Sequence, residues 1–280
     1  MLAFAKKSLQ NRQYNLISSL IMFLKLTEKI IGSFFACYPR RMPKKLEATE
    51  TRLIAHRGAH DKKLGIIENT HDAFARAQAL DCWGIEFDVH ATADGVLVVN
   101  HDPTLTRLWG KNLAIGDLKF KTLRQLVPEI PCLAEVVERY GKRMHLFIEL
   151  KTPFKAEKAL SEELNSLVAG EDYHLLSLDE ALFPTFTAFP PAVMLLVPVH
   201  NNVSQFCELV MQKNYGGVLG HYLLMNKAKI AKLNLAKKRV GVGMVDSRLG
   251  LYRELNRGLS WVFSDRVAVL SDCLQKIKKT

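Results

Sequence analysis

The stretch GIEFDVHATADGVLVVNHD, residues 84–102, decides how this chain folds. It contains two strand-like runs, 84–89 and 96–100, joined by Asp94-Gly95. An Asp-Gly pair between two such runs is typical of a tight hairpin turn, which leaves no room for a crossover helix. Glu86 and Asp88 lie two residues apart, so their side chains share one face of the first strand. The stretch therefore predicts a hairpin that carries two carboxylates on one side.

Outward from this hairpin, strand-like runs alternate with amphipathic helical stretches. The nine expected strands span residues 53–55, 84–89, 96–100, 145–150, 173–177, 193–199, 217–220, 240–245 and 261–264. Helical patterns lie between most of them, at residues 70–80, 133–140, 157–168, 202–213, 226–238 and 248–256. Such alternation indicates parallel strands with crossover helices. A TIM-like (β/α)8 barrel needs one strand fewer, which leaves one of the nine as a hairpin partner or an edge.

We expect residues 51–280 to form this α/β barrel as one domain, because no low-complexity linker divides them. A doubly wound open sheet is the alternative, but no GxGxxG motif opens the first βα turn. Residues 1–50 form a separate amphipathic, basic segment. They hold nine Lys and Arg residues against three Glu residues. The apolar residues of 16–35 fall in pairs that form one face of a helix.

Two interpretations of this amphipathic segment stay open. The helix either covers one end of the barrel, or it lies on an anionic membrane surface, with residues 14–45 supplying both the apolar face and the basic cluster. Lys25, Glu28 and Lys29 near the middle of the apolar run make a membrane-spanning helix costly. A cleaved signal peptide is not expected, because no small-residue cleavage site follows the run.

The composition narrows the class of partner and the compartment. A formal net charge of +11 suggests an anionic partner. Nucleic acid is not expected, because no Arg-rich helix or interleaving of basic and aromatic residues appears after residue 50. The five cysteines are scattered without a CxxC pair, which favours a reducing compartment. We expect a cytoplasmic protein, peripheral to the membrane if the N-terminal segment binds lipid.

Polar residues recur where the predicted strands end. In a barrel these ends meet around one mouth, so side chains from different strands gather there. The residues in question are His56 and Arg57 after the first run, Glu86 and Asp88 in the second, His101 and Asp102 after the third, Glu149 and Lys151 at the fourth, and Asp265 after the last. Packing alone does not explain polar residues at the same end of five strands.

This set has a consistent chemistry. Glu86, Asp88 and Glu149 offer only oxygen ligands, which suits one divalent hard cation, Mg²⁺ or Ca²⁺, better than zinc. Arg57 and Lys151 are placed to contact a phosphate anion. His56 and His101 titrate near neutrality and serve as acid and base. Other polar residues have simpler interpretations. Asp102 suits a turn, and His60 is an ordinary hydrogen-bonding residue.

At these residues the chain resembles the glycerophosphodiester phosphodiesterase family. The matching motifs stand in order: AHRG at 55–58, ENT at 68–70, EFDV at 86–89, HD at 101–102, ELK at 149–151 and SDR at 264–266. The resemblance runs from about residue 52 to 270. It implies a TIM-like barrel, and hydrolysis of glycerophosphodiesters to an alcohol and glycerol 3-phosphate. It also implies that Glu68 supports His56, Arg57 or the metal.

The chain departs from the family pattern at several places. Ile67 replaces the usual Pro before Glu68, Leu108-Trp109 replaces small hydroxyl residues, and residues 242–246 read VGMVD where the family tends to carry a Trp-Thr-Val-Asn segment. The last change leaves the leaving group open. A lysophospholipase D that acts on membrane lysophospholipids is the alternative, and a catalytically inactive membrane-binding module is a third hypothesis. The intact histidines and carboxylates argue against the third.

Overall fold

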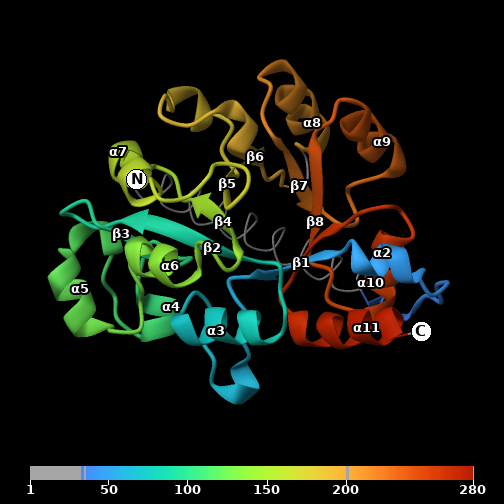
Figure 1. Cartoon of the computed structure of the whole chain (residues 1–280). Helices are drawn as coiled ribbons and strands as arrows, with labels where there is room; N and C mark the ends of the chain where they lie inside the picture. Colours follow the sequence, from blue (N-terminus) through green and yellow to red (C-terminus); the bar gives the residue numbers. More distant parts are fainter. Residues whose placement is uncertain (1–32, 35, 200–201, 280) are drawn as a thin grey trace, which may run out of the picture.

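The computed structural model describes residues 33–34, 36–199 and 202–279. In it, eight parallel strands close into a barrel (Figure 1). The barrel strands are β1 (Arg52–His56), β2 (Gly84–Ala91), β4 (His145–Leu150), β5 (Tyr173–Ser177), β6 (Met194–Leu196), β7 (Gly217–His221), β8 (Arg239–Gly243) and β9 (Trp261–Ser264). Their order is β1-β9-β8-β7-β6-β5-β4-β2, and pairing of β1 with β2 closes the ring. The predicted TIM-like barrel is confirmed.

The additional strand outside the barrel, β3 (Leu97–Val99), is the hairpin partner that the Asp94-Gly95 turn predicts. It pairs antiparallel with the last residues of β2, Val89 to Ala91, and of these only Val89 also pairs with β4. β3 therefore extends the sheet at the end of β2 and is not one of the eight barrel strands. The hairpin returns the chain to the end of β2, where the Asn100 amide donates to the Asp88 carbonyl at 3.0 Å.

Seven helices line the outside of the barrel (Figure 1). They are α3 (His71–Ala79), α6 (Leu133–Tyr140), α7 (Glu157–Glu163), α8 (Val203–Gln212), α9 (Lys227–Leu235), α10 (Arg248–Leu255) and α11 (Val267–Lys279). β5 and β6 are joined instead by two 3₁₀ turns, Phe183–Thr185 and Pro191–Val193. Because helices cover their outer face, strands such as β4 are buried along their full length.

Sequence-local capping sets several helix starts. Thr70 accepts a hydrogen bond from the Ala73 amide at the start of α3, and Ser247 accepts one from the Gly250 amide at the start of α10. Such caps satisfy amides that the first turn leaves without a partner. The predicted helices match in place, but α7 ends five residues before the predicted stretch does.

Residues 98–130 enclose a small second core beside the hairpin. It contains α4 (Thr106–Trp109) and α5 (Phe120–Leu126), and its fully buried residues are Val98, Leu105, Ile115, Leu123, Val127 and Ile130. The sequence pattern predicted no helix here, because both helices are short. This unit packs beside β3 and fixes the turn that carries His101 and Asp102.

Two further helices were not predicted. α11 packs on β1 and buries Val267, Leu270 and Leu274. α2 (Lys45–Thr49) lies on α11, with Ala48 completely buried. The amphipathic helix expected over residues 16–35 lies almost wholly outside the described residues. In the described part of the chain, no helix is long and apolar enough to cross a membrane.

Candidate metal and catalytic centre

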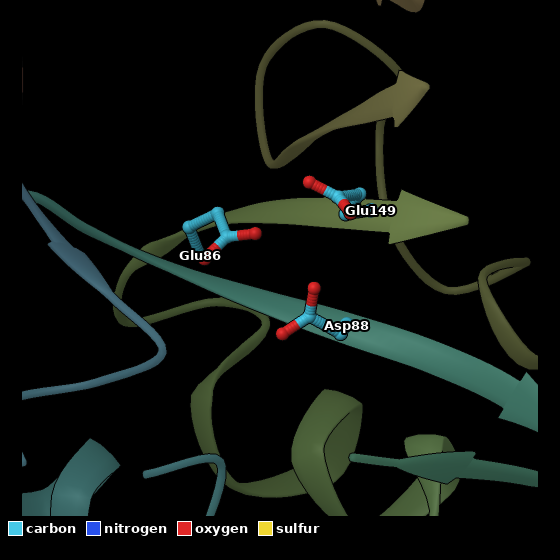
Figure 2. A group of neighbouring side chains, drawn as sticks. All are labelled: Glu86, Asp88 and Glu149. Carbon is cyan, nitrogen blue, oxygen red and sulfur yellow. The ribbon is translucent and has the colours of Figure 1, made fainter. Parts of the chain in front are cut away.

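Three carboxylates meet at the barrel mouth, as Figure 2 shows. Glu86 and Asp88 project from the same face of β2, and Asp88 is the register partner of Glu149 on β4. One ligand oxygen from each residue lies within 4.8 Å of the others. All three side chains are buried, with residue exposures of 2%, 1% and 9%. The strand register therefore gathers the predicted metal ligands.

The titration of this triad reflects crowded negative charge. Burial, followed by repulsion from Asp88, raises the pKa of Glu86 to about 8. The same two causes raise the pKa of Glu149. Burial also acts on Asp88, but Lys151 and Arg57 outweigh it and hold the pKa of Asp88 below its usual value. Lys151 Nζ lies 2.7 Å from Asp88 Oδ1 and also contacts Glu149, so its ammonium group offsets part of the charge.

A divalent cation fits this donor set. All three ligands are oxygens, as Mg²⁺ and Ca²⁺ prefer. The wider cluster also has an excess of negative charge: Glu68, Glu86, Asp88, Asp102, Glu149 and Asp265 against Arg57, Arg107 and Lys151. Buried like charges are costly unless a cation compensates them. The residues present thus favour a hard cation bound between β2 and β4.

The turn after β1 positions Arg57. Arg57 and Gly58 both adopt positive φ, at 54° and 75°, and a Cβ on Gly58 would lie only 2.8 Å from Ala73. This turn needs glycine for space as well as for conformation. It points the Arg57 amide at Glu86 Oε2, 3.1 Å away, while the guanidinium donates to Glu68 at 3.0 Å. Arg57 is therefore held beside the triad by carboxylates on both sides.

His56 is held by a carboxylate from the opposite end of the sequence. Its Nδ1 lies 2.6 Å from Asp265 Oδ1, and its Nε2 lies 3.8 Å from Glu86. His60 Nε2 approaches the same Asp265 oxygen at 3.4 Å. Burial lowers the pKa of His56, but the charges of Glu86 and Asp265 outweigh burial and raise the pKa to about 9. Because Nδ1 donates to Asp265, the Nε2 atom is the one that faces the carboxylate cluster.

His101 has an equivalent arrangement on the other side of the triad. Its Nδ1 lies 2.7 Å from Asp102 Oδ1, and Arg107 Nε donates to the second oxygen of Asp102 at 2.5 Å. Arg107 also donates to Glu68, at 2.7 and 3.2 Å. Glu68 thus joins Arg57 to Arg107 and links the turns after β1 and β3. The two histidines therefore share one plan, in which Nδ1 of each ring lies against a carboxylate oxygen.

The rest of the mouth is apolar. A cavity of about 200 Å³ opens from His56, Glu86 and Glu149 toward the ends of β5 to β9. Its other walls include Leu176, Val197, Leu219, Leu224, Met244 and Phe263. Met244 is 45% exposed and has a φ of 62°, a conformation that is uncommon outside glycine. The residues that depart from the family pattern, Gly243 and Met244, therefore form part of the rim.

The structure brings all eight predicted site residues to one mouth: His56, Arg57, Glu68, Glu86, Asp88, His101, Glu149 and Lys151. Three partners received no role in the sequence analysis. Asp265 and Asp102 hold the histidines, and Asn69 donates to Asp88 at 2.8 Å. Asp102 was interpreted as a turn residue. In the sequence, the one feature that pointed to Asp265 was its position directly after the last predicted strand.

Comparison with known proteins agrees with this geometry. The profile of the glycerophosphoryl diester phosphodiesterase family matches residues 56–243. A glycerophosphodiester phosphodiesterase of Caldanaerobacter subterraneus is 36% identical over 127 residues, which cover 41% of this chain and 51% of the relative. A lysophospholipase D of Mus musculus is 31% identical over 145 residues, covering 52% and 33%. The chain thus matches about half, or less, of the length of these curated relatives.

Solved structures share the fold. A glycerophosphodiester phosphodiesterase of Thermotoga maritima superposes with a TM-score of 0.69 at 24% identity, covering 79% of this chain and 97% of that one. A phosphodiesterase of Oleispira antarctica, solved with the product sn-glycerol-3-phosphate, gives 0.67 at 23% identity, covering 84% and 97%. At this identity the likeness establishes the barrel alone. Because the family profile covers most of the barrel, including the carboxylate triad, the chain belongs to the glycerophosphoryl diester phosphodiesterase family.

Proposed function

We propose that this protein is a metal-dependent phosphodiesterase that hydrolyses glycerophosphodiesters to an alcohol and glycerol 3-phosphate. The observation that carries the proposal is the pair of carboxylate-held histidines, His56–Asp265 and His101–Asp102, near a buried carboxylate triad. Family membership supports the reaction class, and the Oleispira phosphodiesterase, named with its product sn-glycerol-3-phosphate, supports the product.

In the proposed reaction, one histidine Nε2 takes a proton from the attacking nucleophile as it bonds to phosphorus. The other histidine gives a proton to the leaving oxygen as its bond to phosphorus breaks. Asp265 and Asp102 keep each ring in the tautomer whose Nε2 faces the reacting atoms. A bound Mg²⁺ or Ca²⁺ supplies electrostatic stabilisation of the charge on phosphate oxygens.

Arg57 and Lys151 would assist phosphate binding. Both cations lie at the triad, where Lys151 contacts Asp88 and Glu149 and Arg57 contacts Glu68. A phosphate oxygen bound there would contact Arg57 and Lys151 while both cations keep their contacts with the carboxylates. Glu68 then acts through Arg57 and Arg107, which it holds by hydrogen bonds of 3.0 and 2.7 Å.

The decisive experiment measures release of glycerol 3-phosphate from glycerophosphocholine by the purified protein with Mg²⁺, with Ca²⁺ or with EDTA. The proposal predicts turnover with one of the ions and none with EDTA. Turnover that EDTA does not change would remove the cation from the mechanism. His56→Ala and His101→Ala should each lose on the order of 10²-fold or more in kcat. A mild loss in either variant would remove its acid–base role.

A specific observation favours a second candidate, lysophospholipase D activity. The cavity beside His56 is walled by Leu176, Leu219, Leu224 and Phe263, which suits an acyl-bearing substrate better than free glycerophosphocholine. A curated relative carries this activity in its name. Lysophosphatidylcholine supplied in the same assay separates the candidates. Turnover of the lysolipid alone would favour the second, and turnover of glycerophosphocholine alone the first.

Residues 14–45 are proposed to contact an anionic membrane surface. Support comes from their basic residues and from the exposure of Phe34, Tyr38 and Met42, which are 60%, 47% and 48% accessible. Because Arg41 is hydrogen-bonded to Asn256 of the barrel domain, a truncation that tests this should stop at residue 32. Unchanged vesicle binding after that truncation would leave the first 32 residues without a membrane role.

A further inference from the structure

A groove lined by cations lies on the outside of the barrel, where residues 39–41 meet α9 and α10. Its volume is about 700 Å³, and five basic side chains line it: Arg40, Arg41, Lys227, Arg253 and Arg257. Among the described residues, no acidic side chain lines the groove. Behind the groove, the fully buried carboxylate of Glu254 accepts hydrogen bonds from Arg253 and Arg257. Among the described residues, Glu254 forms ion pairs with two of the five cations, Arg253 and Arg257.

The walls of the groove are fixed by hydrogen bonds between distant parts of the chain. Arg41 donates to Asn256 Oδ1 at 3.2 Å, and Asn256 donates back to the Arg41 carbonyl at 2.8 Å. Arg253 donates to the Tyr222 carbonyl at 3.0 Å, and Arg257 to the Met225 carbonyl. Preorganised cations bind an anion at a smaller entropic cost than mobile ones do. The groove therefore has the rigidity of a binding site.

The start of α9 adds a second favourable feature. Asn226 and Lys227, at its first turn, lie in the wall of the groove. α9 is nine residues long, and no residue of its first turn is acidic. Asn226 caps the Lys229 amide at 2.9 Å, so the helix begins in regular geometry. The amino end of a helix carries partial positive charge and attracts anions, which here adds to the five side chains.

We propose that this groove binds the phosphate group of an anionic ligand, at a site separate from the carboxylate triad. Arginine side chains that converge from several elements match the oxygens of a phosphate group. The loop of residues 221–226 separates the two sites. His221 and Leu224 line the catalytic cavity, whereas Asn226 lines the groove. A bound phosphate would lie just outside the wall of the mouth. A lipid headgroup and a free phosphate compound both supply this chemistry.

The test uses the full chain with Arg41→Gln and Lys227→Gln combined. Both side chains are exposed, and neither contacts a residue of the catalytic centre. The matched control combines Lys119→Gln and Lys121→Gln at the start of α5, on the opposite side of the barrel (Figure 1). Two probes are used. Inorganic phosphate is titrated calorimetrically in EDTA, and vesicles of phosphatidylcholine with or without phosphatidylglycerol are sedimented with the protein.

The groove variant should bind inorganic phosphate on the order of tenfold more weakly than wild type, while the control does not change. If the ligand is a headgroup, binding to the anionic vesicles should also fall by roughly 30-fold, at about fivefold per basic residue. Loss of phosphate binding alone identifies a free phosphate compound. Equal binding by the groove variant and the control for both probes would overturn the proposal.

Turnover of glycerophosphocholine separates this proposal from the catalytic one. The groove variant should hydrolyse it at the wild-type rate, since the triad and both histidines are unchanged. Wild-type protein that binds phosphate in the groove but releases no glycerol 3-phosphate would refute the proposed function and leave the groove intact. A groove variant that loses turnover together with phosphate binding would show that the calorimetric signal comes from the catalytic mouth, which would also overturn the groove assignment.

Discussion

Replacing Asp265 by Asn tests whether the residue after the last strand orients His56 for acid–base catalysis. In the wild-type protein Asp265 Oδ1 lies 2.6 Å from His56 Nδ1 and 3.4 Å from His60 Nε2. Asn keeps the shape but removes the charge, and its amide nitrogen can present a donor where His56 needs an acceptor. The His56 ring then loses the charged acceptor that holds Nδ1–H and helps to raise its pKa, so neither the orientation nor the protonation of Nε2 is fixed any longer.

The expected loss follows from the bond that is weakened. A hydrogen bond to a charged group contributes roughly 1.5–3 kcal/mol, which corresponds to roughly 10- to 150-fold in rate if it acts in the transition state. We therefore expect Asp265→Asn to lower kcat by about 10²-fold and to leave KM within a few-fold. The assay is release of glycerol 3-phosphate from glycerophosphocholine at saturating Mg²⁺ or Ca²⁺.

The control is Asp272→Asn, the same change at an exposed residue of α11 that pairs with Lys276. It should keep wild-type kcat. Thermal unfolding shows whether either variant is destabilised, and calorimetry with the cation shows whether Asp265→Asn acts through metal affinity. A loss of less than about threefold for Asp265→Asn, in a folded protein with unchanged cation affinity, would refute the orienting role.

Three other predictions follow from the site and the barrel. Glu149→Gln removes one of three clustered carboxylates and should raise the cation Kd by more than about tenfold, measured calorimetrically. Met244→Asp places charge on the apolar rim and should lower kcat/KM for lysophosphatidylcholine by roughly tenfold while turnover of glycerophosphocholine persists. Burial lowers the pKa of His145 to about 4 and that of His174 to about 3. Below pH 6.5 these two histidines are therefore protonated in the unfolded chain but stay neutral in the folded protein. Each of these two histidines should therefore contribute about 2 kcal/mol less to the free energy of unfolding at pH 5 than at pH 7.5, and the difference in urea stability between wild type and His174→Phe should shift by that amount over this range.

The barrel was predictable because its signal is periodic and repeats along the chain. The Asp94-Gly95 turn predicted a hairpin between the second and third strand-like runs, since so short a connection cannot contain a crossover helix. The ligand triad was predictable for a related reason. Glu86 and Asp88 share a strand face by alternation, and parallel strands bring their carboxyl ends to one mouth.

The carboxylate partners of His56 and His101 were harder to predict, because they depend on contacts that no local pattern encodes. Asp265 is 209 residues from His56, and only pairing of β1 with β9 brings the two together. Asp102 follows His101 directly, yet an Asp after a strand is common in turns, and its role depends on how Arg107 orients its carboxylate. The small core of residues 98–130 sets that orientation, and its short helices gave no periodic signal.

The charged and the apolar residues occupy different parts of the mouth. Apart from Asp265, the charged residues lie on or directly after β1, β2 and β4 and in the segments that follow β1 and β3, whereas β5 to β9 supply mainly apolar walls such as Leu176 and Leu219. A group bound against those walls lies beside His56 but away from His101, because His101 is not in the cavity lining. Changes at Gly243 or Met244 can therefore alter which substituent is accepted without moving the triad. On this basis, the departure from the family pattern at residues 242–246 should change which substrate is selected and leave the reaction itself unchanged.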